Sequence, residues 1–207
     1  MEEVEVKEEK KYYDFISIAK RTAQEVYFIA QHDKNKALGL LLKSANEKQR
    51  VVICKSKKSA DALDAYLKAE GIKSLAIHGN HRAEQVEDAR RSFTVGETKV
   101  LITTDMILKV LDLKAKMDEI ISYDLSTDTQ DYFNRLRLVD ELGRSIVFVC
   151  SDDEKNFEAV EFAMRCEMQE MEIESFTPSP APRQEKKRKK PRHKKGKVRK
   201  DFREDNE

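Results

Sequence analysis

The stretch that decides the fold is AIHGNHRAEQVEDARRSFTVGETKVLITTDMILKVLDL, residues 76–113. It opens at the end of one apolar run, SLAI (74–77), and after a polar stretch reaches a second, KVLITT (99–104). Short runs that are apolar on both faces are typical of strands buried inside a parallel sheet. The stretch therefore predicts two buried strands joined by a helix.

The same alternation extends along the chain in both directions. The clearest helical pattern is SADALDAYLKAEG (59–71), whose apolar residues fall on one face and whose Gly71 ends the helix. Strands that alternate with helices require a parallel sheet covered by helices on both sides, so the predicted fold class is α/β. Four further runs are predicted to be strands: VYFIA (26–30), VVIC (51–54), EIIS (119–122) and SIVFVC (145–150).

The domain boundaries follow from where this alternation ends. A final helix is expected from about 152 to 168, with Ser151 as its N-cap. We predict a polar lead-in at 1–21 and one folded domain at 22–176. Residues 177–207 begin with a proline-rich segment and continue as a Lys/Arg run with almost nothing apolar to bury, so they are expected to be disordered.

The basic tail indicates the class of partner. The whole chain carries a net charge of +1, but residues 183–207 contain 13 Lys or Arg against 5 Asp or Glu. Such a segment attaches to nucleic acid by neutralising phosphates and releasing counterions. We therefore expect an RNA partner, although a merely solubilising tail remains an alternative. The tail residues expected to bind RNA are Lys186, Lys187, Arg188, Lys189, Lys190, Lys194 and Lys195.

Several other functions are not expected. The three cysteines show no C-x-x-C spacing, and no apolar run approaches the roughly 20 residues of a membrane span, so a cytoplasmic protein without a membrane partner is predicted. No G-x-x-x-x-G-K-S/T loop is present, so no bound cofactor is expected for the chain alone. His78 and His81 have no evident carboxylate or cysteine partners, so no metal site is predicted.

Five landmarks occur in order: the segment 24–42, the strand and loop 51–63, His-Gly at 78–79, Thr-Asp at 104–105, and a helix with Tyr-Phe-Asn-Arg at 132–135. Together they resemble the C-terminal RecA-like domain of DEAD-box RNA helicases, most nearly the bacterial RhlE-like branch. The resemblance covers about residues 22–174. It implies a RecA-like parallel sheet flanked by helices.

The resemblance also implies contacts to the RNA backbone. Backbone contacts position RNA without reading its bases. Each matching residue has an ordinary alternative role: a solvated loop lysine, a glycine in a turn or the cap of a helix. The positions that match the family's RNA contacts are Lys55, Ser56, Lys57, Gly79 and Thr104.

The arginines that act on ATP in the family are mostly replaced. The family pattern H-R-x-G-R-x-G-R lies on a helix and reaches the triphosphate held by the other domain, where such arginines stabilise the transition state. In NRLRLVDELGR (134–144) only Arg135 matches, and the two later arginines fall on Leu138 and Glu141. Compensation by Arg137 or Arg144 is a minor alternative. Residual nucleotide contacts are predicted at Asp112 and Arg135.

Three hypotheses follow from these observations. The first is an RNA-binding protein that is non-catalytic alone and uses both the RecA-like face and the basic tail. The second is one half of a split ATP-dependent RNA helicase, in which a separate P-loop domain brings the ATP and Arg135→Ala abolishes activity. The third is a protein-interaction module in a ribosome-assembly or RNA-decay complex.

Overall fold

The computed structural model describes residues 16–44, 48–111, 113 and 117–180. Their strands form one sheet in the order β3-β4-β2-β5-β6-β1-β7, and every neighbouring pair is parallel. The predicted parallel α/β sheet is confirmed. The strands are β1 (Ala23–Phe28), β2 (Arg50–Ile53), β3 (Ser74–Ala76), β4 (Val100–Thr103), β5 (Met117–Ser122), β6 (Val139–Val149) and β7 (Gln169–Glu170).

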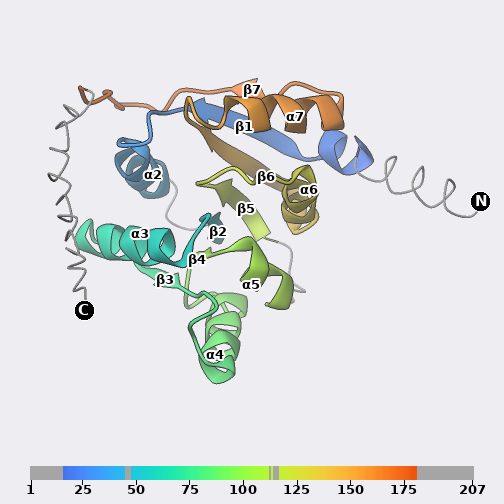
Figure 1. The fold of residues 1–207 in the computed structure, drawn as a ribbon. Coiled ribbons are helices and arrows are strands. Elements are labelled where there is room, and N and C mark those ends of the chain that lie inside the picture. The colour runs from blue at the N-terminus through green and yellow to red at the C-terminus, as the bar shows by residue number, and fades with distance from the viewer. Residues whose placement is uncertain (1–15, 45–47, 112, 114–116, 181–207) are drawn as a thin grey trace, which may run out of the picture.

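Helices cover both faces of the sheet (Figure 1). Their apolar residues pack with α2 and α3 on one face and with α4 to α7 on the other. Since all strands run the same way, the loops that enter these helices gather at one edge, at the carboxyl ends of the strands. The helices are α2 (Lys34–Lys43), α3 (Lys57–Ala69), α4 (Ala83–Thr94), α5 (Asp105–Val110), α6 (Thr129–Leu136) and α7 (Glu154–Met164).

The start of α7 differs from the prediction. The N-cap residue is Asp153, not Ser151, because a turn closed by the hydrogen bond from Asp153 N to Cys150 O precedes the helix. The Asp153 carboxylate does not cap the helix. It instead accepts hydrogen bonds from Lys34 Nζ at 3.1 Å and from Cys150 Sγ at 3.0 Å.

The C-terminal strap, residues 169–180, returns across the domain and binds it. Met171 N donates to Val26 O at 2.9 Å, and three strap side chains pack against the core: Met171, Ile173 and Phe176. Lys36 Nζ donates to Thr177 O, and Ser179 N donates to Asp33 Oδ2, both at 2.8 Å. The Ser179 hydrogen bond also lowers the pKa of Asp33. The docked chain therefore continues past the boundary predicted at 176.

Gly143 allows β5 and β6 to pair through an irregular register. The register shifts between Met117, which pairs with Val139, and Glu119, which pairs with Arg144. A Cβ at Gly143 would lie 2.6 Å from Asp118 O and 3.0 Å from Met117 O, so backbone atoms would have to move.

We expect Gly143→Ala to lower the free energy of unfolding by about 1–3 kcal/mol, as overpacking of a filled site does. Urea denaturation measures this. Gly39→Ala is the matched control, since its Cβ would meet only ordinary contact with Tyr66 in the middle of a helix. It should be neutral or stabilising by up to about 1 kcal/mol. Equal effects of both changes would contradict the steric explanation.

Within the residues described, no helix combines the length and the apolar character needed to cross a membrane.

Candidate functional site

The five positions expected to bind the RNA backbone lie together in one pocket. Its volume is about 300 Å³, and it sits where β2, β3 and β4 end. We call this pocket the carboxyl-edge pocket. Sequence-distant segments therefore converge as the parallel sheet requires. The lining residues are Lys55, Ser56, Lys57, Gly79, Thr104, Asp105 and Met106.

Two hydrogen bonds hold the loop between β2 and α3 in place. Ser56 is the N-cap of α3, and its hydroxyl accepts a hydrogen bond from Ser59 N at 3.1 Å. Lys55 N donates to Asp124 Oδ2 at 2.8 Å, which ties the loop to the end of β5. The Lys55 side chain is exposed. The loop thus presents a cation on a fixed backbone, at an edge where the N-terminus of α3 adds partial positive charge.

Lys57 lies over Gly79. Its Nζ donates to Asn80 Oδ1 at 2.7 Å, and a Cβ at Gly79 would approach that Nζ to 3.3 Å. A side chain at position 79 would therefore press on the ammonium group. The absence of Cβ keeps this cation close to the backbone, with Gly79 itself exposed.

His78 has the carboxylate partner that the sequence did not reveal. Its buried Nε2 lies 2.7 Å from Asp61 Oδ1 on α3, and its ring lies 4.3 Å from the His81 ring. The expectation that His78 lacks an acidic partner is corrected, since the fold brings the two segments together. No group of three or more potential metal-binding side chains occurs in the part of the chain that the structure describes.

Arg135 is held inside the domain. Its guanidinium donates to both carboxylate oxygens of Asp105, at 2.8 and 2.7 Å, and to Ser122 Oγ at 2.7 Å. A fourth hydrogen bond reaches Asp124 O at 3.2 Å. The side chain is 1% exposed. These contacts describe a structural role that joins α5, α6 and β5, whereas its predicted nucleotide contact stays a prediction.

The segment after α6 is not the helix that the resemblance implies. The helix ends at Leu136, and β6 begins at Val139. Leu138 lies in the turn between them and packs against the core, and residue 141 belongs to β6. The chain therefore has no helical turn at positions 138 and 141, where the resemblance led us to expect one.

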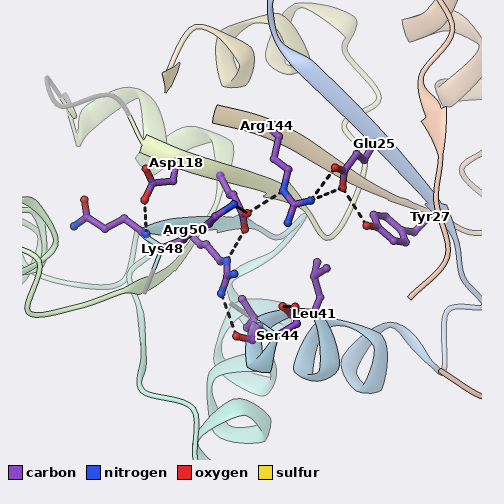
Figure 2. Close-up of polar contacts among 11 residues, drawn as sticks. Glu25, Tyr27, Leu41, Ser44, Lys48, Arg50, Asp118 and Arg144 are labelled. Atoms are coloured by element: carbon purple, nitrogen blue, oxygen red, sulfur yellow. Dashed lines mark hydrogen bonds and ion pairs between the residues drawn. The ribbon is translucent and has the colours of Figure 1, made fainter. Parts of the chain in front are cut away.

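Arg144 forms ion pairs at the opposite edge of the sheet, near the start of β1. Its Nη1 donates to both carboxylate oxygens of Glu25, at 2.8 and 3.0 Å, and its Nε donates to Glu119 Oε1 at 2.9 Å (Figure 2). Arg144 pairs with Ala23 at the start of β1, far from the carboxyl ends of the strands. These contacts argue against Arg144 as a replacement for the missing arginines.

Two residues of the site were missed from the sequence. Asp124 holds the Lys55 backbone, and the buried Lys34 lies 3.8 Å from Asp124 Oδ1 and donates to Tyr123 O at 3.1 Å. An acid directly after a buried strand was an available signal for Asp124. Lys34 gave none, because its partners lie 89 and 119 residues away.

Two groups of predicted site residues lie outside the described residues. Asp112, predicted to contact a nucleotide, is one of them. The others are the tail residues Lys186, Lys187, Arg188, Lys189, Lys190, Lys194 and Lys195.

Comparison with known proteins gives consistent results. Residues 33–144 match the family model described as helicase conserved C-terminal domain. The ATP-dependent RNA helicase FAL1 of Mycosarcoma maydis is 28% identical over 128 residues, which cover 60% of this chain and 32% of that protein. This chain thus spans about a third of the length of that curated relative.

Solved structures of DEAD-box proteins share the fold. A DEAD box protein from the hyperthermophile Methanococcus jannaschii is 25% identical, with a TM-score of 0.69 over 75% of this chain and 43% of that chain. The E. coli DEAD-box protein SrmB, solved in complex with regulator of ribonuclease activity A, gives a TM-score of 0.70 at 19% identity. That similarity covers 78% of this chain and 96% of the SrmB chain.

Proposed function

This chain belongs to the helicase conserved C-terminal domain family, in the form found in DEAD-box RNA helicases, and from that premise we propose that it binds the RNA backbone without hydrolysing ATP. The observation that carries the proposal is the carboxyl-edge pocket, where Lys55 and Lys57 flank an exposed glycine backbone. The basic tail supplies most of the affinity, since each neutralised phosphate releases counterions. Within the family, we place the chain near the RhlE-like branch.

The geometry around the missing arginines supports the non-catalytic part of the proposal. Leu138 packs against the core, and Arg144 is bound by Glu25 and Glu119 at the far edge. A side chain that stabilises a transferring phosphoryl group must be free to face it. An ATPase assay with an added P-loop domain should therefore show no stimulation above that domain alone, and a clear stimulation would contradict this part.

Binding to structured RNA across a salt series tests the RNA proposal. Lys55→Ser combined with Lys57→Ser should weaken RNA binding about tenfold. It should also make the fall of log K with log salt less steep by about two, since two phosphate contacts are lost. Removal of residues 183–207 should weaken RNA binding further and reduce the salt dependence of binding further. Filter binding measures both quantities.

A variant with the same loss of charge is the control. Lys20→Ser combined with Lys155→Ser removes two exposed lysines that lie outside the carboxyl-edge pocket. This change should weaken RNA binding less than about threefold. An affinity unchanged by removal of 183–207 would exclude the role of the tail. Equal effects of the two lysine pairs would exclude the pocket.

An exposed apolar pair favours a protein partner as the second candidate function. Met106 and Val110 lie one turn apart on α5 and are 68% and 67% exposed, beside the carboxyl-edge pocket. SrmB, which shares the fold, was solved bound to a protein regulator. A partner that docks on α5 would be captured by the chain after nuclease treatment and lost on Met106→Ser combined with Val110→Ser, whereas RNA-bridged capture would disappear with nuclease.

A further inference from the structure

A second cationic pocket lies at the opposite edge of the sheet. It is formed where β2 and β4 begin and α2 and α3 end, and its volume is about 390 Å³. We call it the amino-edge pocket. Its charged lining residues are Lys43, Arg50, Glu70, Lys73 and Lys99.

One nitrogen of the Arg50 guanidinium, Nη2, has no hydrogen-bond partner within the described part of the chain. Its Nε donates to Glu119 Oε2 at 2.5 Å and its Nη1 donates to Leu42 O at 3.1 Å, while the side chain is only 2% exposed. Figure 2 shows this guanidinium between the sheet and the end of α2. Among the described residues, Arg50 Nη2 is the one buried side-chain nitrogen or oxygen without a hydrogen-bond partner. Buried polar groups are otherwise almost always paired, so this atom needs an acceptor.

The charges around the pocket favour an anion as that acceptor. Glu119 is already shared by Arg50, Lys48 and Arg144. The pocket's own acid, Glu70, pairs with Lys43 at 2.8 Å. Lys73 and Lys99 form no ion pair with any residue that the structure describes. Two ammonium groups are therefore not neutralised locally, and Arg50 shares its carboxylate partner with two other cations.

We propose that the amino-edge pocket binds the phosphoryl group of a phosphate-bearing ligand. Arg50 Nη2, which has almost no accessible surface in the free protein, donates to a phosphate oxygen once the side chain turns toward the pocket. Lys73 and Lys99 supply the remaining positive charge, which suits phosphate because charge-assisted hydrogen bonds to its oxygens are strong. The volume leaves room for a ligand with more than one phosphoryl group or with an organic group. The proposal does not depend on RNA binding at the carboxyl edge.

Pyrophosphate is the probe, and the intact chain is the protein to use. Isothermal titration should detect binding, and Lys73→Ser combined with Lys99→Ser should weaken it at least about tenfold, since two charge-assisted contacts are lost. Both lysines lie at the protein surface, so the variant should fold normally. The nitrogen resonances of the Arg50 guanidinium should shift when pyrophosphate is added to the wild-type chain.

Two further variants identify the source of the phosphoryl group. Lys55→Ser combined with Lys57→Ser should keep pyrophosphate binding, and Lys20→Ser combined with Lys155→Ser serves as the charge control. If the ligand is a free phosphorylated compound, the Lys73 and Lys99 variant binds RNA as well as the control does. If the phosphoryl group belongs to RNA, that variant loses clearly more RNA affinity than the control. The proposal is overturned if the Lys73 and Lys99 variant binds both pyrophosphate and RNA as well as the charge control does.

Discussion

Arg135→Ala is expected to lower the free energy of unfolding by about 3–5 kcal/mol, because it leaves the Asp105 carboxylate without its ion-pair partner in a largely buried site. Urea denaturation followed by circular dichroism measures the change. The wild-type guanidinium donates four hydrogen bonds that connect Asp105, Ser122 and the Asp124 backbone. The loss is a large part of the 5–15 kcal/mol that stabilises a typical domain.

Arg91→Ala is the control for this prediction, since Arg91 is exposed on α4. It should change the free energy of unfolding by less than about 0.5 kcal/mol. If Arg135→Ala costs less than about 1 kcal/mol, the structural role assigned to Arg135 is wrong. The same prediction bears on functional tests: a loss of activity in the Arg135 variant is informative only at temperatures where that variant remains folded.

Glu119→Gln should have a similar effect, about 3–5 kcal/mol, because it removes the one carboxylate shared by Arg50, Lys48 and Arg144. Glu119 is fully buried at the start of β5. Glu70→Gln is the matched control. It removes the carboxylate of the exposed pair with Lys43 and should cost less than about 1 kcal/mol. Equal costs in the two variants would contradict the importance of the buried network.

The pH dependence of stability gives an independent readout of Glu119. Burial alone would raise the pKa of this carboxyl, but the hydrogen bonds from Lys48 and Arg50 outweigh burial and lower it below its usual range. A carboxyl with a lowered pKa in the folded state stabilises the protein above its unfolded pKa, and this contribution is lost as the pH falls. Wild-type stability should therefore decline in acid more steeply than that of Glu119→Gln, measured as urea midpoints between neutral and acid pH.

The strands were predictable because the signal for a buried parallel strand is local. The predicted runs VVIC and KVLITT begin within one residue of the observed starts of β2 and β4, since both faces of these strands are apolar. The start of β6 was missed by six residues, because Asp140, Glu141 and Gly143 interrupt the apolar pattern in an irregular register. A register shift depends on the neighbouring strand, and one strand's sequence does not encode it alone.

The candidate site was predictable only in part, for a related reason. Lys55, Gly79 and Thr104 follow three strands, and parallel pairing brings them to one edge. Partnerships such as Arg50 with Glu119 and Lys34 with Asp153 join positions 69 and 119 residues apart. The sequence around each residue does not indicate its partner. These buried ion pairs, and the unpaired Nη2 of Arg50, are therefore known only from the structure.

The C-terminal strap has a practical consequence for attaching labels to this protein. Ser179 donates a hydrogen bond to Asp33, which follows the end of β1, so the last described residues lie at the same edge of the sheet as the carboxyl-edge pocket. A fluorophore placed just after Pro180 would report on ligands arriving at that edge. Immobilising the protein through the same position would turn the edge toward the support, whereas a label near residue 16, ahead of β1, would leave it open to solution.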